Sequence, residues 1–131
     1  MTHVVVAIIT KRSNSDEYLL ISSRRDFGKY TGYYYPPSGH VEEGEDELSA
    51  LHREMREELN AGVTAVEKLV DTDGDIQNQK TSWYLCEFDG YEFTVNEDEL
   101  QDVGFFTSEQ METMNVWPAT RKMFAEYIFK E

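Results

Sequence analysis

Three glutamates close together on one predicted helix are the strongest chemical feature of this sequence. Glu54, Glu57 and Glu58 stand at positions i, i+3 and i+4, so their carboxylates would project from one sector of a helix. Like charges at these spacings destabilise a helix by roughly 0.2–0.5 kcal/mol per pair unless cations neutralise them. Mg²⁺ prefers oxygen ligands and is usually held by a few carboxylates together with substrate phosphates. The cluster is therefore a candidate magnesium site, although an acidic stretch on a helix is more often a solvated face.

The helix that must carry these glutamates has an apolar stripe of its own. Its apolar residues recur at i, i+3, i+7 and i+11, and they are Leu48, Leu51, Met55 and Leu59. This spacing predicts one narrow face turned toward a core. Ala50 lies one turn before Glu54, and we expect its small side chain to leave room beside that carboxylate for a ligand to approach.

A fixed framework of residues surrounds the glutamates. It runs Gly, five residues, Glu, seven residues, Arg-Glu-apolar, one residue and Glu-Glu, and its members are Gly39, Glu45, Arg53, Glu54, Met55, Glu57 and Glu58. The framework, about a sixth of the chain, resembles the signature of the Nudix hydrolase family, which includes the MutT-like enzymes. Where the family pattern has a glycine that ends the helix, this chain has Asn60, the residue next most able to adopt a left-handed conformation. Gly62 is the alternative helix cap.

The resemblance implies a fold, a reaction and a cofactor. The fold is one α/β domain over residues 1–131, a mixed β-sheet between helices with the signature as a loop, helix and loop. The reaction is Mg²⁺-dependent hydrolysis of a diphosphate bond in a nucleoside diphosphate derivative. A nucleoside triphosphate, ordinary or modified, would be cut to monophosphate and pyrophosphate. One to three Mg²⁺ ions, with Mn²⁺ as a substitute, would be held by the Gly39 carbonyl and by Glu54, Glu57 and Glu58.

Further roles follow from the same resemblance. Arg53 is expected to orient Glu54 or Glu57, and Glu45 to brace the loop through a basic partner. Family members often supply one more glutamate from a loop after the signature, as a metal ligand or as the base that activates water. Glu99 is the preferred candidate, Glu97 is its competitor, and a purely solvated acidic loop is the third reading. The general base stays open among Glu54, Glu58 and Glu99.

Four residues are candidates for binding the substrate. Arg24 and Arg25 stand where many Nudix enzymes have a basic residue on substrate phosphate, or they are a surface pair in an acidic protein. Tyr35 closes a run of three tyrosines that is predicted to alternate between core and surface, with stacking on a base as the alternative. Trp117 resembles the base-contacting segment of Nudix enzymes that hydrolyse oxidised purine nucleotides, or it is a core residue at a helix start. Ala119 stands where those enzymes have an acidic residue, which argues against recognition of oxidised guanine by that route.

The elements that must position these residues can be placed by pattern. The apolar, β-branched segments predict strands over Val4–Thr10, Tyr18–Ser22, Val63–Val70, Thr81–Phe88 and Val103–Thr107. In the fourth strand Trp83 and Leu85 should face one way, and Tyr84, Cys86 and Phe88 the other. Turn residues predict that Phe27–Pro37 is a loop leading into a short strand, and they predict a turn at Asp73-Gly74. Ser108 is the predicted N-cap of a short helical turn over Glu109–Met114, and a final helix is expected from Val116 to Tyr127.

Composition limits the classes of partner. The chain has 131 residues, with 12 basic against 26 acidic side chains and a formal charge of −14. This charge argues against a nucleic-acid polymer or an anionic membrane as the main partner, and it leaves a small nucleotide carried in with Mg²⁺. Cys86 is the single cysteine, which excludes an internal disulfide and suits a reducing, cytoplasmic compartment. We find no signal-peptide pattern and no apolar stretch long enough for a membrane span. A monomer and a homodimer are both compatible with the sequence.

Other readings of the signature remain. The substrate could be ADP-ribose or another nucleotide sugar, or a dinucleoside polyphosphate, and a capped RNA end is the least favoured because the chain is acidic. In a different class, the fold could be a nucleotide sensor without turnover. That function usually requires the loss of a signature carboxylate, and none is lost here.

Overall fold

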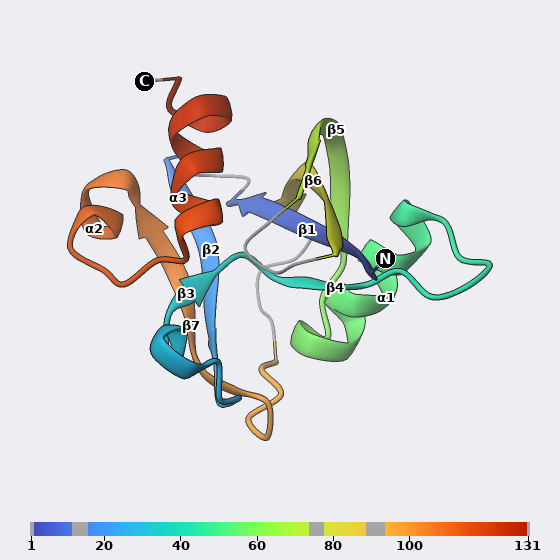
Figure 1. Ribbon diagram of the computed structural model, residues 1–131, viewed down its shortest axis with the longest axis horizontal. Helices are drawn as coiled ribbons and strands as arrows, with labels where there is room; N and C mark the ends of the chain where they lie inside the picture. Colours follow the sequence, from blue (N-terminus) through green and yellow to red (C-terminus); the bar gives the residue numbers. More distant parts are fainter. Residues whose placement is uncertain (1, 12–15, 74–77, 89–93, 131) are drawn as a thin grey trace.

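A mixed β-sheet forms the centre of the molecule (Figure 1). The computed structural model describes residues 2–11, 16–73, 78–88 and 94–130. Within these residues the sheet order is β3-β2-β1-β6-β5, with β4 paired to β1 and β7 paired to β2. The strands are β1 (Thr2–Thr10), β2 (Glu17–Ser23), β3 (Tyr34–Tyr35), β4 (Ser38–His40), β5 (Val63–Thr72), β6 (Gln79–Phe88) and β7 (Leu100–Thr107). β1 and β6 run parallel and the other paired strands are antiparallel, which confirms the predicted mixed sheet.

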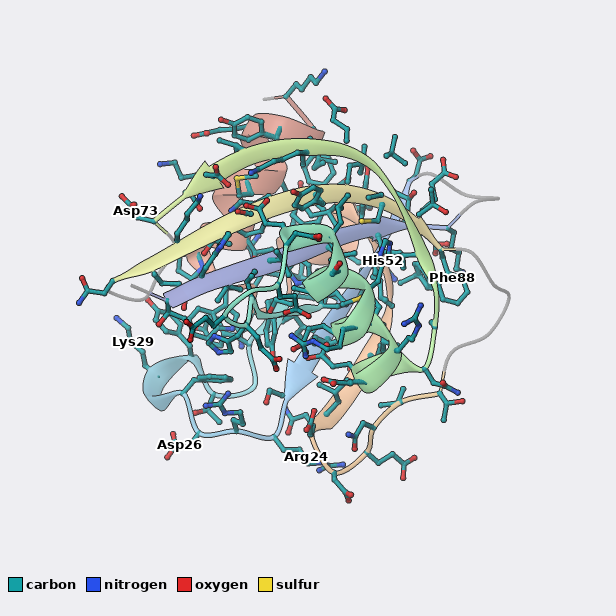
Figure 2. The ribbon with its side chains drawn as sticks, turned by 90° about the vertical axis from the view of Figure 1, so that its right-hand side faces the viewer. Arg24, Asp26, Lys29, His52, Asp73 and Phe88 are labelled. Carbon is teal, nitrogen blue, oxygen red and sulfur yellow. The ribbon has the colours of Figure 1, made fainter. Side chains whose placement is uncertain are left out.

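Helices cover both faces of this sheet. They are α1 (Glu47–Leu59), α2 (Ser108–Glu112) and α3 (Pro118–Met123), which continues as a π-helical turn over Phe124–Ile128. In β1, Val5, Ala7 and Ile9 pack with α1, whereas Val4, Val6 and Ile8 pack with α2 and α3. A strand with apolar residues at every position is expected to be buried on both faces. Figure 2 shows α1 lying across one face of the sheet, and the arrangement confirms the predicted layers.

The segment from Tyr34 to His40 fills a wedge between two diverging strands. β1 pairs with β4 at Val4–Val6 but with β2 only at Thr10, and β2 in turn pairs with β3 near its other end. The chain crosses from β2 to β1 at Pro36 and Pro37, which are fully buried and have no backbone N–H to satisfy. β4 therefore lies against the edge of β1, directly before the signature helix (Figure 1).

The ends of α1 are fixed by side-chain and backbone capping. The Asp46 carboxylate accepts a hydrogen bond from the Ser49 N–H, which satisfies a donor that the first helical turn leaves open. Asn60 adopts the left-handed conformation (φ 48°, ψ 42°), and its N–H donates to the Arg56 carbonyl. The helix ends at Leu59, so Asn60 is the cap as predicted and Gly62 is not.

Two predictions about the face of α1 are wrong. Leu48 was expected in the core, but its side chain is 42% exposed, because it lies in the first turn beside an open hollow. Ala50 was expected to leave room beside Glu54, but it is fully buried and packs in the core. The buried stripe is therefore Ala50, Leu51, Met55 and Leu59. It begins at Ala50, where the helix first meets the sheet.

Two helix starts near the C-terminus also differ from prediction. The N-cap of α2 is Thr107, since its side chain accepts from the Gln110 N–H while the Gln110 side chain accepts from the Thr107 N–H. β7 runs directly into α2, so Ser108 is already helical and the helix ends at Glu112. α3 begins at Pro118, because Val116 forms a parallel bridge with Tyr34.

The remaining strand predictions hold. The structure extends each of the five by two or three residues in total. β6 alternates as expected, with Trp83 packed on the α3 side and Tyr84, Cys86 and Phe88 on the α1 side. Of the predicted Asp73-Gly74 turn, Gly74 lies outside the described residues. Among the helices that the structure describes, none has the length and apolar character of a membrane span.

Candidate active site

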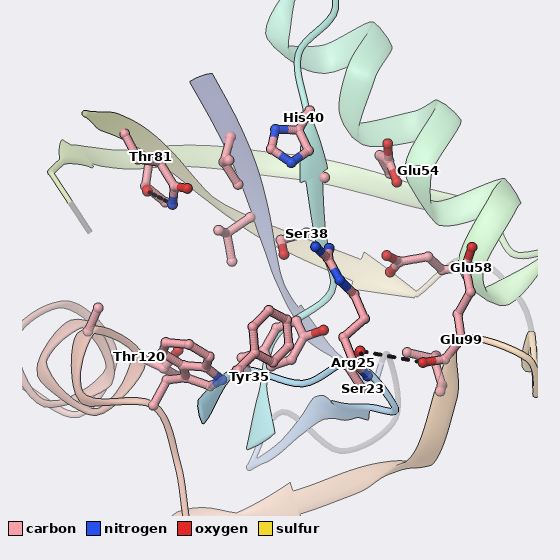
Figure 3. Close-up of a pocket in the computed structure, with 18 of the residues that line it drawn as sticks. Ser23, Arg25, Tyr35, Ser38, His40, Glu54, Glu58, Thr81, Glu99 and Thr120 are labelled. Carbon is pink, nitrogen blue, oxygen red and sulfur yellow. Dashed lines mark hydrogen bonds between the residues drawn. The ribbon is translucent and has the colours of Figure 1, made fainter. Parts of the chain in front are cut away.

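A cleft of about 540 Å³ opens over the wedge segment (Figure 3). Its floor is made by β1, β4 and β6, and its walls by α1, the end of β2, the loop before β7 and the start of α3. Figure 3 shows Glu54, Glu58 and Glu99 together on one side, with Thr81 and Thr120 on the other. The cleft therefore has an acidic end and a nearly neutral end.

Gly39 is required where β4 passes the signature helix. A Cβ built on Gly39 would lie 2.0 Å from the Glu54 Cδ atom and 2.5 Å from its Oε2 atom, far inside van der Waals contact. Only glycine lets the Glu54 carboxylate lie directly against the backbone of β4. This contact explains physically why the first position of the framework carries no side chain.

Arg53 ties the loop, β4 and the glutamates together. Its guanidinium donates to both oxygens of Glu45, at 2.9 and 3.0 Å, and to the His40 carbonyl at 2.9 Å. Nη1 donates to Glu54 at 2.9 Å and to Glu57 at 3.3 Å. The hydrogen bonds from Arg53 hold the pKa of the Glu45 carboxyl at about 2. Glu45 thus has the basic partner expected from the sequence, and Arg53 donates to Glu54 from outside the cleft lining.

The structure brings two of the three signature glutamates into the cleft. The side chain of Glu54 is 15% exposed, whereas that of Glu57 is 59% exposed and lies outside the cleft lining. Glu99 joins Glu54 and Glu58 from the loop before β7. No three His, Cys, Asp or Glu side chains of the described residues stand ready as a closed metal-binding group. The carboxylates share the acidic end of the cleft without converging on one point.

The surroundings of Glu58 oppose the ionisation of its carboxyl. Its Oε2 atom is buried and has no hydrogen-bond partner among the described residues. Burial, together with the charges of Glu54, Glu99 and Glu57, raises the pKa of the Glu58 carboxyl from 4.5 to about 8. Burial also raises the pKa of Glu54. A buried carboxylate is stable only with a positive partner, and these hard oxygen donors fit a divalent cation in that position.

The two adjacent arginines have different surroundings. Arg25 extends into the cleft toward Ser38, between Tyr35 and Glu58 (Figure 3), and its guanidinium carbon lies 5.3 Å from the centre of the Phe27 ring. Arg24 also borders the cleft, but its Nε atom donates to the Glu97 carbonyl at 2.7 Å. Of the two downstream candidates, Glu99 lines the cleft and Glu97 does not.

Aromatic rings border the cleft beside Tyr35. The Trp117 ring centre lies 4.8 Å from Tyr30, 5.4 Å from Phe27 and 6.4 Å from Tyr35. Trp117 is thus both a packing residue at the start of α3 and part of the cleft lining. Burial raises the pKa of Tyr35 to about 12, so its hydroxyl stays protonated. Tyr34 and Tyr35 lie on opposite faces of the sheet, but the predicted alternation between core and surface is wrong, because helices cover both faces and each tyrosine packs against a core cluster.

Sequence reasoning missed several residues that line the cleft. They come from β4, β6 and α3, and they are Ser38, His40, Gln79, Thr81 and Thr120. The strand register explains why two of these residues line the same cleft. His40 and Thr81 both pair with Val4, so their side chains share a face of the sheet. No local pattern in the sequence specifies which strands become neighbours.

Comparison with known proteins gives consistent results. The family model described as the NUDIX domain matches residues 1–127. The nucleoside triphosphatase NudI of Enterobacter sp. (strain 638) is 32% identical over 126 residues, covering 86% of this chain and 89% of that protein. The NAD-capped RNA hydrolase NudC of Haemophilus influenzae (strain PittEE) is 26% identical over 104 residues, covering 79% of this chain but only 39% of the relative. The crystal structure of a MutT NUDIX hydrolase from Burkholderia pseudomallei superposes with a TM-score of 0.75 at 24% identity, covering 97% of each chain.

Proposed function

The chain belongs to the Nudix hydrolase family, which acts on nucleoside diphosphate derivatives, and we propose that its substrate is a nucleoside triphosphate, ordinary or modified. Hydrolysis would release a nucleoside monophosphate and pyrophosphate. Members of the family generally need a divalent metal ion, and we propose Mg²⁺, for which Mn²⁺ can substitute.

One observation carries this proposal: the acidic end and the aromatic wall belong to the same cleft. A triphosphate brought in with Mg²⁺ needs carboxylates at one end, and its base needs apolar or aromatic surface at the other. The similarity to a nucleoside triphosphatase over most of both chains supports the same substrate class.

The carboxylates of the acidic end have defined tasks in this proposal. Glu54, Glu58 and Glu99, with the Gly39 carbonyl, would hold the metal, and Glu57 would contribute from the solvent side. Bound Mg²⁺ polarises phosphoryl oxygens and lowers the pKa of a coordinated water. Arg53 fixes the rotamer of Glu54 through the 2.9 Å hydrogen bond. The proton of the attacking water would pass to a carboxylate, and Glu54, Glu58 and Glu99 are the candidates in reach of the cleft.

Arg25 and the aromatic residues would bind the rest of the substrate. A planar guanidinium donates two parallel hydrogen bonds to phosphate oxygens, and Arg25 extends into the cleft close to Glu58 (Figure 3). Trp117 and Tyr35 would contact the nucleoside, with Thr81 and Thr120 on the same side of the cleft as its base. Ala119 lines this part of the cleft, so the base meets no carboxylate from that position.

A nucleotide sugar such as ADP-ribose, or a dinucleoside polyphosphate, is the second candidate substrate. NudC is named for NAD-capped RNA and this chain spans about two fifths of its length, so that similarity supports a capped RNA end only as a further candidate. The sensor reading is less favoured, because every signature carboxylate is present and Glu54 and Glu58 lie in the cleft.

A substrate panel tests the proposal. The purified protein would be incubated with nucleoside triphosphates, oxidised purine nucleotides, ADP-ribose and diadenosine polyphosphates, in Mg²⁺ and in EDTA, and the products separated by anion-exchange chromatography. We expect metal-dependent release of monophosphate and pyrophosphate from a triphosphate. Glu54→Gln, purified in parallel, should lose roughly 10²-fold in turnover, which excludes a contaminating enzyme. Cleavage confined to ADP-ribose or a dinucleotide would refute the proposal that the substrate is a triphosphate. Absence of product from every compound in the panel would favour the nucleotide-sensor function.

A further inference from the structure

The loop of residues 94–100, here called the acidic loop, brings Glu99 to the cleft. It forms no helix or strand before Leu100, and its apolar side chains Val95 and Leu100 pack against the core on the α1 side of the sheet. Hydrogen bonds also hold its backbone on two sides, to the end of α1 and to the end of β2. The position of the Glu99 carboxylate depends on both attachments.

The attachment to α1 uses the last carbonyls of the helix. The Thr94 N–H donates to the Leu59 carbonyl at 2.8 Å, and the Asn96 N–H donates to the Glu58 carbonyl at 3.1 Å. Such carbonyls have no partner within the helix, so the loop satisfies acceptors that would otherwise need water. The loop is therefore bonded to the backbone of Glu58, which lies beside Glu99 at the acidic end of the cleft (Figure 3).

The attachment to β2 is made by Arg24. Its backbone N–H donates to the Glu99 carbonyl at 2.9 Å, and its guanidinium Nε donates to the Glu97 carbonyl at 2.7 Å. The Ser23 hydroxyl adds a weaker contact to the Glu99 carbonyl at 3.5 Å. Arg24 thus donates hydrogen bonds to two carbonyls of the loop, one on each side of Asp98. Figure 2 shows Arg24 at the end of β2, beside this loop.

A tight turn held by Asn96 connects the Glu97 carbonyl to Glu99. The N–H groups of Glu99 and Leu100 both donate to the Asn96 carbonyl, at 3.1 and 3.0 Å, and the Asp98 N–H donates to the Asn96 side chain at 3.2 Å. An Asn that bonds the backbone two residues on forms an Asx turn, which is locally rigid. A shift of the Glu97 carbonyl would therefore move Glu99 with it.

We propose that Arg24 is a positioning residue that acts through Glu99. By holding the acidic loop against β2 it keeps the Glu99 carboxylate turned toward Glu58, and the contact with substrate phosphate belongs to Arg25. This division of roles rests on the proposed function, because it takes Glu99 as a ligand of the divalent cation.

Metal binding without substrate separates positioning from simple charge. Arg24→Met removes the guanidinium and keeps the apolar stem, and Arg25→Met is the matched control one residue away. Loss of a positive charge beside a cation site should leave metal affinity unchanged or raise it, which we expect for Arg25→Met. For Arg24→Met we expect weaker binding instead, by about tenfold, the lower end of the range for residues that orient metal ligands. Mn²⁺ binding would be measured by the loss of the free-ion signal in electron paramagnetic resonance.

A double-mutant cycle supplies the decisive comparison. If Arg24 acts through Glu99, the double variant Arg24→Met/Glu99→Gln should bind Mn²⁺ no more weakly than Glu99→Gln alone. Arg24→Lys, which keeps the charge but lacks Nε, should also bind more weakly than the wild type. Thermal unfolding of each variant would verify that the fold is retained.

Three outcomes would overturn the inference: Arg24→Met binding Mn²⁺ as tightly as Arg25→Met, additive effects in the cycle, or Glu99→Gln leaving Mn²⁺ binding unchanged. None of these requires turnover. A wild-type protein that binds Mn²⁺ in this pattern but hydrolyses no nucleotide would instead refute the proposed function and leave the positioning role intact.

Discussion

Replacing Glu58 by Gln is expected to stabilise the metal-free protein at neutral and alkaline pH. The Glu58 carboxyl has a pKa of about 8 in the folded protein and 4.5 as the reference value for the unfolded chain, because burial and three neighbouring carboxylates oppose its ionisation. The folded state therefore keeps this proton over a pH range in which the unfolded chain has lost it. The stability associated with Glu58 is fully present below about pH 4.5, falls as the pH rises, and is lost above about pH 8.

The size of the effect follows from the shift. One pKa unit corresponds to about 1.4 kcal/mol, so the total loss between acid and alkaline pH is at most about 5 kcal/mol, and about 3 kcal/mol is lost by pH 7. These are upper values, because the cleft that Glu58 lines is open to water. Gln has nearly the same shape and no charge, so Glu58→Gln should avoid most of this loss.

Urea unfolding in EDTA at pH 5, 7 and 8.5, followed by tryptophan fluorescence, would measure the difference. We expect the variant to match the wild type at pH 5 and to exceed its unfolding free energy by roughly 2–4 kcal/mol at pH 8.5. Glu57→Gln is the matched control, because it removes the same charge from a side chain that is 59% exposed. Mg²⁺ should stabilise the wild type more than the variant. If both proteins lost stability in parallel between pH 5 and 8.5, Glu58 would not carry the buried charge inferred here.

Three further predictions concern the signature. Gly39→Ala should reduce turnover at least about tenfold, because its Cβ would displace the Glu54 carboxylate; steady-state kinetics with circular dichroism as a folding control would test this, and normal turnover would contradict the close packing. Glu57→Gln should lower turnover by at least roughly 10²-fold in saturating Mg²⁺ while leaving metal-free stability undiminished, and near-wild-type rates would remove Glu57 from the proposed metal site. Asn60→Ala should lower the unfolding free energy by about 1 kcal/mol in urea, whereas Asn60→Gly should not, because only the alanine is strained at φ 48°; equal effects would contradict a left-handed cap.

Residues within the signature could be located from sequence because their spacing lies along one helix and the loop before it. The i, i+3, i+4 positions put Glu54 near Glu58, and the left-handed cap was recognisable in Asn60. The prediction erred on Leu48 because helical periodicity identifies a face but not the residue at which the helix first meets the sheet. It erred on Ser108 for a similar reason: either Thr107 or Ser108 could cap α2, and the end of β7 decides between them.

The residues at the neutral end of the cleft could not be predicted from local sequence patterns. Thr81 and Thr120 read as an ordinary strand residue and an ordinary helix residue in the sequence, and only the pairing of β1 with both β4 and β6 brings Thr81 beside His40. Such contacts depend on strand order, which periodicity does not specify. Arg24 and Arg25 show the same limit at short range, since two adjacent residues of one type face different partners.

The wedge between β1 and β2 explains why the cleft lies where it does. A continuous sheet would separate the layer of α1 from the layer of α2 and α3, and a carboxylate on α1 could not share a cleft with a ring at the start of α3. Because β1 and β2 diverge, the segment from Tyr34 to His40 passes between them and brings Tyr35, Ser38 and His40 to the opening. Gly39 then lets Glu54 approach across β4, while Tyr35 and Trp117 lie in contact on the same opening. Glu54 and Glu58 thus come from the layer of α1 and Trp117 from the start of α3, so a substrate that reaches both must lie across the edge of β4.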